Sequence, residues 1–177
     1  ADALGKTFCI MEHNEKQSKN DEALLLKKNA EMGNANLDLR RIYVLTGSVT
    51  ASASEAVINC LIPYLTRSNI MVIGEKTIGK RVGSNTFGTR EEYDWLLHPI
   101  TLRIYNANYE ADYANGFEPD VKIEELVIGN DLLPFGDTNE MLLSEALSQI
   151  SGLKSLSARA ESKGRILLTP SSLERKQ

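Results

Sequence analysis

An apolar segment, a helical segment and a second apolar segment follow one another between residues 41 and 74. Residues 41–46 and 70–74 are short runs of large aliphatic side chains bounded by turn residues, which is typical of buried strands. Residues 52–66 between them predict a helix with one apolar face. That face consists of Val57, Cys60, Leu61, Tyr64 and Leu65, at helical spacing. A strand, a helix and a second strand in this order predict a βαβ unit with parallel strands, and therefore an α/β fold.

The flanking segments predict further strands, two loops and a second helix. Strands are expected at 6–12, 95–105 and 121–123, where apolar and polar residues alternate or form short apolar runs. Residues 16–22 and 82–89 are rich in polar residues or glycine, and we expect loops there. Residues 21–30 fit either a short helix or the return strand of a hairpin.

The second helix is expected near the C-terminal end of the globular part. Residues 137–140, Asp-Thr-Asn-Glu, form a capping-box pattern that predicts its start. Its apolar face is expected to contain Leu143, Ala146, Leu147 and Ile150. After Gly152 the chain becomes polar, so we assign residues 1–152 to the domain and 153–177 to a polar tail.

Length, charge and cysteine spacing exclude several classes of protein. A chain of 177 residues fits one domain, and its net charge of −4 offers no basic surface for nucleic acid. No apolar run reaches the roughly 18 residues that a membrane-spanning helix requires. Cys9 and Cys60 lack the spacing of metal ligands. Because Cys60 lies on the apolar helical face, buried free thiols are favoured over a disulfide, but the sequence leaves both open.

Ser52 lies in a turn of small residues between the first strand and the helix of the βαβ unit. Residues 50–55 read Thr-Ala-Ser-Ala-Ser-Glu, so Ser52 and Glu55 fit a capping box, which is the commoner role for this pattern. A second interpretation makes Ser52 a nucleophile, because small neighbours leave room for a substrate. The N–H groups at the start of a helix, such as that of Ala53, would stabilise an oxyanion there.

Lys80 follows a loop flanked by glycines, 28 residues after Ser52. It fits a surface lysine, or a general base for Ser52 if burial and the neighbouring Arg81 favour its neutral form. Lys76 is the competing base, with Glu75 beside it. Residues 74–80 also resemble part of a phosphate-binding loop, but Arg81 stands where Ser or Thr binds magnesium.

Histidine offers another route to a general base. His13 and His98 are the two histidines of the chain, and a Ser-His-Asp triad assembled in space stays open at this point. A polar role at the end of a strand is the commoner role for His98. Asp120 and Asp137 follow turn-forming residues and fit turns and caps better than catalysis. No cluster of Cys, His and Asp predicts a metal site.

Two motifs together resemble the core of the S41 peptidases, the carboxyl-terminal processing or tail-specific proteases. They are Thr-Ala-Ser-Ala-Ser-Glu at 50–55 and Val-Ile-Gly-Glu-Lys-Thr-Ile-Gly-Lys at 72–80. The turn Gly-Phe-Glu-Pro-Asp at 116–120 and Leu-Pro-Phe-Gly-Asp at 133–137 also look like that family. The resemblance covers about residues 41–150.

The resemblance implies a crotonase- or ClpP-like α/β fold and a serine endopeptidase with a Ser/Lys dyad. Matching the motifs assigns Ser52 as nucleophile, Lys80 as base and the Ala53 N–H as an oxyanion donor. No cofactor is implied. The implied substrate is a polypeptide, usually an unstructured C-terminal tail, and the implied location is the periplasm or cell envelope.

This sequence departs from the family pattern in three ways. The spacing from Ser52 to Lys80 is longer, Ser84 stands where better-known members have a lysine-orienting Gln, and the upstream glycines of the oxyanion hole are missing. We therefore expect the C-terminal part of a larger catalytic domain that is inactive or weakly active alone, with exposed apolar surface that favours homo-oligomers. The alternative is a non-catalytic S41-like homologue that binds peptides or protein tails.

Overall fold

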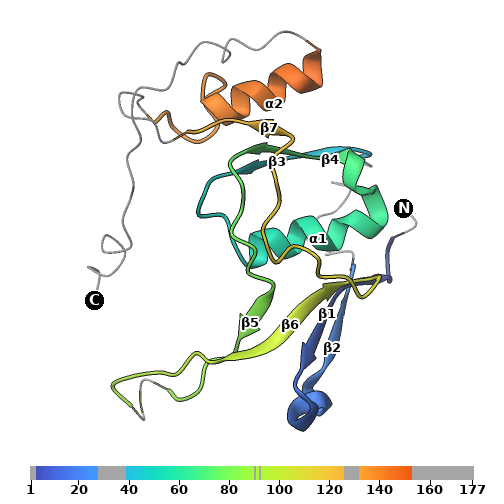
Figure 1. Cartoon of the computed structure of the whole chain (residues 1–177), viewed down its shortest axis with the longest axis vertical. Coiled ribbons are helices and arrows are strands. Elements are labelled where there is room, and N and C mark those ends of the chain that lie inside the picture. Colours follow the sequence, from blue (N-terminus) through green and yellow to red (C-terminus); the bar gives the residue numbers. More distant parts are fainter. Residues whose placement is uncertain (1–2, 28–38, 90, 92, 126–131, 153–177) are drawn as a thin grey trace.

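The structure is a computed structural model that describes residues 3–27, 39–89, 91, 93–125 and 132–152. The predicted polar tail, 153–177, lies outside the described residues. The described residues form two sheets and two α-helices, in agreement with the predicted α/β class. Helix α1 lies between the two sheets, and α2 covers the other face of the sheet that contains β3 and β4 (Figure 1).

The three-stranded sheet contains the predicted βαβ unit. Its order is β3-β4-β7, and all neighbouring strands are parallel. The elements are β3 (Ile42–Thr46), α1 (Ala53–Leu65), the 3-10 helix η3 (Arg67–Asn69), β4 (Ile70–Gly74) and β7 (Val121–Lys122). The central strand β4 is buried, as predicted, and the side chains of Ile70, Val72 and Ile73 are fully enclosed. Strand β3 was also predicted to be buried, but it is only half-buried and its Leu45 is exposed. The reason is that β3 is an edge strand, with β4 as its one neighbour in this sheet among the described residues.

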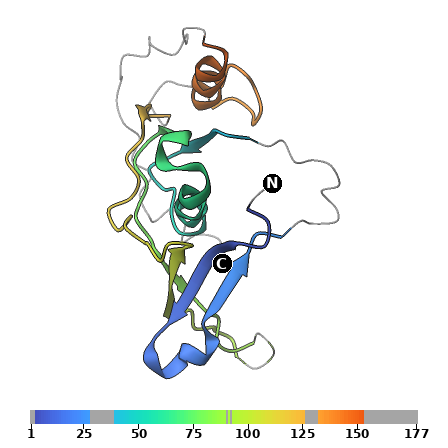
Figure 2. The ribbon, with the colours of Figure 1, turned by 90° about the vertical axis from the view of Figure 1, so that its right-hand side faces the viewer.

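The four-stranded sheet is antiparallel and has the order β2-β1-β6-β5. Its elements are β1 (Thr7–His13), the 3-10 helix η1 (Glu15–Asn20), β2 (Glu22–Leu25), β5 (Val82–Ser84) and β6 (Ile100–Asn106). The ambiguous segment at 21–30 thus contributes a return strand, β2, and the hairpin extends away from α1 (Figure 2).

Three expectations for this sheet were wrong in detail. The charged segment before β2 forms η1 instead of a loop, because Asn14 caps it by accepting from the Lys16 N–H at 3.1 Å. The expected loop at 82–89 begins with β5, which pairs with β6. The long strand expected at 95–105 begins only at Ile100. Before it, the described residues of 85–89 and 95–99 are joined by one isolated bridge, between Phe87 and Leu97.

The buried face of α1 differs from the predicted apolar stripe. Val57 is 47% exposed, whereas Glu55 and Asn59 are buried, with Ala56, Ile58 and Cys60. Hydrogen bonds explain the difference, because the Asn59 side chain donates to the Glu110 carbonyl at 2.8 Å inside the protein. Burial of a polar side chain is tolerated when its hydrogen bonds are made there.

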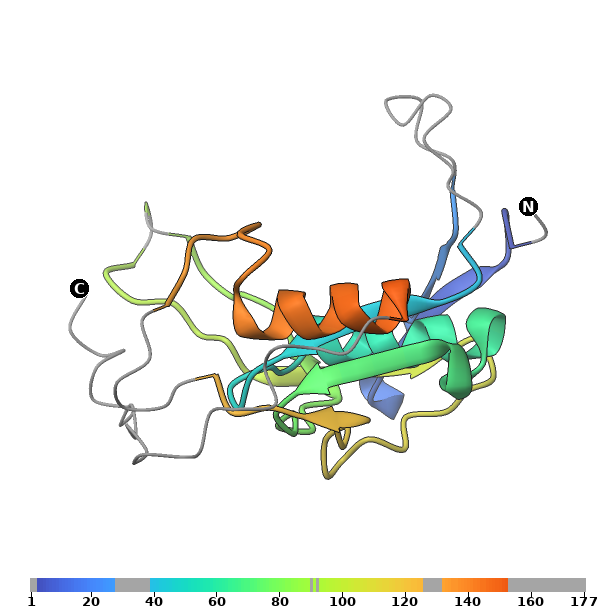
Figure 3. The same ribbon diagram turned by 90° about the horizontal axis from the view of Figure 1, so that it is seen from above.

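Helix α2 (Met141–Ser151) runs along β3 and β4 (Figure 3). It begins later than the capping pattern predicts, because Glu140 accepts from the N–H groups of Leu142 and Leu143, both at 2.8 Å. Leu142 and Ala146 pack against Ile73. The predicted apolar face was therefore right at Ala146 and wrong for Leu147 and Ile150, which are 38% and 62% exposed.

Cys9 and Cys60 are both buried and free, as favoured from the sequence. Burial raises the pKa of the Cys60 thiol to about 12, with a smaller effect from Cys9. Across the described ranges, no helix combines the length and the apolar character that crossing a membrane requires.

Candidate active site

Ser52 stands at the turn between the loop after β3 and the first residue of α1. Its backbone has φ 58° and ψ −117°, a region that residues other than glycine rarely adopt. Thr66 and Tyr109 are the other non-glycine residues with positive φ in the described ranges. Such strain costs about 1–3 kcal/mol and persists only where surrounding contacts hold the turn. This strained turn places Ser52 between a strand and the N-terminus of α1.

The Glu55 carboxylate is the main contact that holds this turn. Glu55 is fully buried one helical turn after Ser52, and each of its two oxygens accepts two hydrogen bonds. Oε2 accepts from the Ser52 N–H at 2.9 Å and the Lys80 N–H at 2.8 Å. Oε1 accepts from the Thr77 hydroxyl at 2.6 Å and the Gly79 N–H at 2.5 Å.

All four partners of Glu55 are donors, and this fits an ionised carboxylate, which only accepts hydrogen bonds. Burying an isolated charge is costly, but four charge-assisted hydrogen bonds offset that cost. The bond to the Ser52 N–H is also the carboxylate half of the predicted capping box. Glu55 therefore serves as a helix cap and also joins the serine turn to the loop that carries Lys80.

The lysine loop, residues 75–80, is packed between the serine turn and a later segment of the chain. On one side the Ile78 N–H donates to the Thr50 carbonyl at 2.9 Å. On the other side Gly79, with φ 95°, lies so close to residue 114 that an added Cβ would be 2.3 Å from the Ala114 carbonyl oxygen. Only glycine fits this position. Because β5 follows Lys80 where a phosphate-binding loop requires a helix, the nucleotide-binding alternative has no structural support.

The two candidate lysines have different surroundings. The Lys76 ammonium forms an ion pair with Glu118 at 2.5 Å. Lys80 has an exposed side chain and forms no ion pair within the described part of the chain. Its backbone is fixed by Glu55, but no hydrogen bond joins its ammonium to the Ser52 hydroxyl in the same ranges.

Ala53 and Ser84 complete the set of residues predicted from the sequence. Ala53 is the first residue of α1, where backbone N–H groups lack partners within the helix, and it is exposed beside Ser52. Ser84 is exposed at the end of β5. The structure thus brings together the backbones of Ser52, Ala53 and Lys80. Ser84 makes no hydrogen bond to Lys80 among the described residues.

The histidines and aspartates considered from the sequence have partners away from Ser52. His98 Nδ1 lies 3.1 Å from the Thr86 hydroxyl, and His13 Nδ1 lies 3.4 Å from the Asp21 carboxylate. Asp137 accepts from the Asn139 N–H at 2.9 Å in a local turn. These contacts give no support to a Ser-His-Asp triad.

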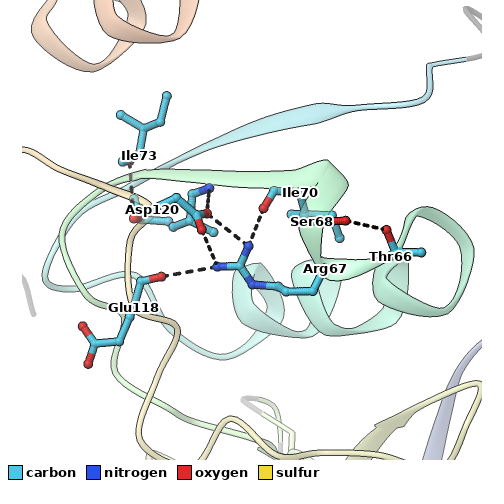
Figure 4. Close-up of polar contacts among 9 residues, drawn as sticks. Thr66, Arg67, Ser68, Ile70, Ile73, Glu118 and Asp120 are labelled. Atoms are coloured by element: carbon cyan, nitrogen blue, oxygen red, sulfur yellow. Dashed lines mark hydrogen bonds and ion pairs between the residues drawn. The ribbon is translucent and has the colours of Figure 1, made fainter. Parts of the chain in front are cut away.

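Asp120 has a structural role in the parallel sheet. Its carboxylate accepts from the Val72 N–H at 2.8 Å and from Arg67 at 3.1 and 3.3 Å (Figure 4). The Arg67 guanidinium also donates to the carbonyls of Ile70 and Glu118. These contacts hold the segment before β7 against η3 and β4. The Asp120 side chain thus stabilises the packing of this turn, the kind of role that its turn context predicts.

Sequence reasoning missed the central role of Glu55 and gave no role to Thr77. A partial signal existed for Glu55, because the Ser-x-x-Glu capping pattern already pairs it with Ser52. No local signal exists for Thr77, whose partners are distant in the sequence. Within the described ranges, no three His, Cys, Asp or Glu residues are grouped so that they could hold a metal ion.

Comparisons with known proteins identify the family of this chain. The family model "Peptidase family S41" matches residues 1–123. A crystal structure described as an S41 protease from Bacteroides fragilis is 34% identical, with a TM-score of 0.77, and covers 87% of this chain. A lipoprotein from Streptococcus agalactiae covers 85% of this chain, with 18% sequence identity and a TM-score of 0.50. The photosystem II D1 C-terminal processing protease covers 80% of this chain, with 19% sequence identity and a TM-score of 0.46.

The matched region is a portion of each of these structures. It corresponds to 39% of the B. fragilis protein, 46% of the lipoprotein and 32% of the processing protease. A comparison with curated proteins finds no match. The family model covers well over half of the chain and includes both motifs, so this chain belongs to peptidase family S41.

Proposed function

We propose that the chain carries the nucleophile and the general base of a serine endopeptidase, Ser52 and Lys80. The observation that carries this proposal is the shared contact to Glu55 Oε2, which holds the backbones of the two residues at one buried carboxylate. The strained backbone of Ser52 supports it further. The ion pair of Lys76 with Glu118 favours Lys80 over Lys76 as the base.

The proposed reaction proceeds through an acyl-enzyme. Neutral Lys80 takes the hydroxyl proton as Ser52 Oγ bonds to the scissile carbonyl carbon. The resulting oxyanion accepts from the Ala53 N–H, with the positive end of the α1 dipole behind it. The C–N bond then breaks, and Lys80 returns its proton to the leaving amine. Water hydrolyses the ester by the same steps and regenerates Ser52.

Lys80 is exposed in this structure, so the proposal requires that substrate or further chain covers it during the reaction. Removal of water around an ammonium favours its neutral form. Hydrogen bonds between catalytic groups are often long without substrate and tighten in the complex. The motif resemblance supports unstructured C-terminal tails of proteins as the substrate, and the periplasm or cell envelope as the location.

Labelling with a fluorophosphonate probe tests the nucleophile in the full-length protein. We expect one label on Ser52, located by peptide mass spectrometry, and its loss in Ser52→Ala. Ser54→Ala is the matched control, because Ser54 is exposed in the first turn of α1 and its replacement should leave labelling unchanged. Labelling that persists in Ser52→Ala contradicts the assignment.

Cleavage of a disordered peptide tests the base. Lys80→Ala should abolish cleavage, whereas Lys76→Ala should retain it because Lys76 is engaged with Glu118. The reverse result would reassign the base to Lys76.

The alternative function is peptide binding without catalysis. Two observations favour it: Ser84 replaces the lysine-orienting Gln of the family, and no direct contact joins Ser52 and Lys80 among the described residues. Binding of a tail peptide without any fluorophosphonate label would establish that alternative.

A further inference from the structure

A segment from the C-terminal side of β6 lies along the lysine loop on the face opposite the serine turn. The contacts run in antiparallel order, from Lys76 with Glu118, through Thr77 with Phe117, to Gly79 beside Ala114. We call residues 113–118 the clamp segment. Phe117 in this segment stacks on Tyr113, with ring centroids 5.2 Å apart. The clamp segment therefore faces the loop that positions Lys80.

Thr77 connects the clamp segment to the carboxylate of the site. It is 4% exposed, and its hydroxyl accepts from the Phe117 N–H at 2.7 Å. The same hydroxyl donates to Glu55 Oε1 at 2.6 Å. The Thr77 N–H closes the pair by donating to the Phe117 carbonyl at 3.2 Å. A hydroxyl has a single proton, so the bond from Phe117 leaves that proton for Glu55.

The backbone contact at Gly116 fixes the distance between the clamp segment and Thr77. Gly116 has φ 77°, and an added Cβ would be 1.9 Å from the Thr77 carbonyl oxygen. The two backbones thus lie as close as glycine allows. Because the main chain of Thr77 is held there, its hydroxyl has a fixed direction toward Glu55.

We propose that Thr77 is a positioning residue for the reaction at Ser52, through the bond chain from Phe117 N–H to Thr77 hydroxyl to Glu55 carboxylate. This inference rests on the proposed function. The Thr77 bond orients the Glu55 carboxyl plane, so that Oε2 stays between the N–H groups of Ser52 and Lys80. A rotation of that plane would move both backbones and separate nucleophile from base.

Replacements of Thr77 separate the hydroxyl from the side-chain volume. Valine keeps the shape but leaves the Phe117 N–H without an acceptor and Glu55 Oε1 with one donor fewer. Serine retains the hydroxyl and loses only a methyl group. Thr77→Ala and Thr77→Ser differ from each other by one oxygen atom. Comparing these two variants therefore tests the hydroxyl a second time, without a change in branching of the side chain.

The test measures fluorophosphonate labelling rates and peptide-cleavage kinetics in the full-length protein and its Thr77→Val, Thr77→Ser and Thr77→Ala variants. A small displacement of catalytic groups costs up to about 100-fold in rate. We expect Thr77→Val and Thr77→Ala to lose about 10- to 100-fold in labelling rate and kcat, with KM within about twofold. Thr77→Ser should recover most of this rate.

Equal rates in Thr77→Ala and Thr77→Ser, with Ser52 labelled in the unaltered protein, would overturn the positioning role and leave the proposed function intact. A loss confined to KM would also overturn it. If Ser52 in the unaltered protein takes no label, the proposed function fails and this inference fails with it. If Thr77→Val does not fold, the comparison of the alanine and serine variants decides.

Discussion

Ser52 and Lys80 donate their backbone N–H groups to the same atom, Oε2 of Glu55, at 2.9 and 2.8 Å. The two residues lie on different elements, the N-terminus of α1 and the loop after β4. One buried carboxylate thus fixes the relative position of a strained serine turn and a lysine loop. Two further donors, on Thr77 and Gly79, satisfy its other oxygen, so the charge is compensated locally.

Glu55→Gln should lower both stability and activity. A glutamine amide has one oxygen and one NH2 group. Its NH2 group would therefore face two of the four N–H and O–H donors from which Glu55 now accepts hydrogen bonds, and donors cannot pair with one another. Hydrogen bonds to a charged group are worth about 1.5–3 kcal/mol each, and we expect a loss of about 2–4 kcal/mol in unfolding free energy. Urea denaturation measures this loss, and fluorophosphonate labelling measures the effect on Ser52.

Glu118→Gln is the control for this prediction. Glu118 also contacts a residue of the lysine loop, but its side chain is 71% exposed in the ion pair with Lys76. Exposed ion pairs contribute about 0–1 kcal/mol, so this variant should unfold close to the unaltered protein. Equal stability losses in Glu55→Gln and Glu118→Gln would contradict the role assigned to the buried carboxylate.

Much of the architecture could be predicted from local patterns. The βαβ unit, the burial of β4 and the helix after Ser52 follow from periodicity and from short apolar runs. The motifs around Ser52 and Lys80 also suggested that the two residues belong to one site. These features depend on neighbours in the sequence, and hydrophobic burial on a strand or helix face is enough to specify them.

The remaining features depend on contacts between residues far apart in the sequence. The buried face of α1 was predicted wrongly because Glu55 and Asn59 are polar, yet their partners, such as Thr77 and Glu110, come from other segments. The contact of Thr77 with Phe117 spans 40 residues. A hydropathy pattern counts polar residues as exposed and carries no information about such partners.

Gly79→Ala should destabilise the lysine loop strongly. The added Cβ would be 2.3 Å from the Ala114 carbonyl oxygen, and φ is 95°. Backbone strain and displacement of the clamp segment together should cost about 2–4 kcal/mol. Chemical denaturation measures the loss.

Two other glycines separate the causes of that loss. Gly136 has φ 88° with nothing within 4 Å of an added Cβ, so Gly136→Ala tests backbone strain alone and should cost about 1–2 kcal/mol. Gly47 has open space and no positive φ, so Gly47→Ala should be neutral or slightly stabilising. A Gly79→Ala variant as stable as Gly47→Ala would refute the close packing of the lysine loop.

Asp120→Ala should cost more stability than Arg67→Ala. Both side chains are about one-third exposed, so their ion pair alone is worth at most about 1 kcal/mol. Removal of Asp120 also leaves the Val72 N–H without its acceptor, and a buried unpaired donor costs about 1–3 kcal/mol. Denaturation midpoints of the two variants measure the difference. Equal losses would show that the Val72 contact is worth no more than the bonds from Arg67 to the carbonyls of Ile70 and Glu118.

Tyr113→Phe should stabilise the protein. Tyr113 is 2% exposed, and its hydroxyl has no hydrogen-bond partner among the described residues. Removing an unpaired buried hydroxyl should gain about 1 kcal/mol at pH 7 in urea denaturation. Tyr93→Phe is the control, because Tyr93 is 52% exposed and its replacement should change little.

The stabilising effect of Tyr113→Phe should grow at alkaline pH. Burial, with smaller effects from Cys60 and Glu55, raises the pKa of Tyr113 to about 12 from its usual value of 10.0. Between these values the unfolded chain releases the proton and the folded protein keeps it, so stability falls as pH rises. The variant lacks this loss, and its advantage in urea midpoint should be larger at pH near 11 than at pH 7. An advantage that stays constant across this range would contradict the raised pKa.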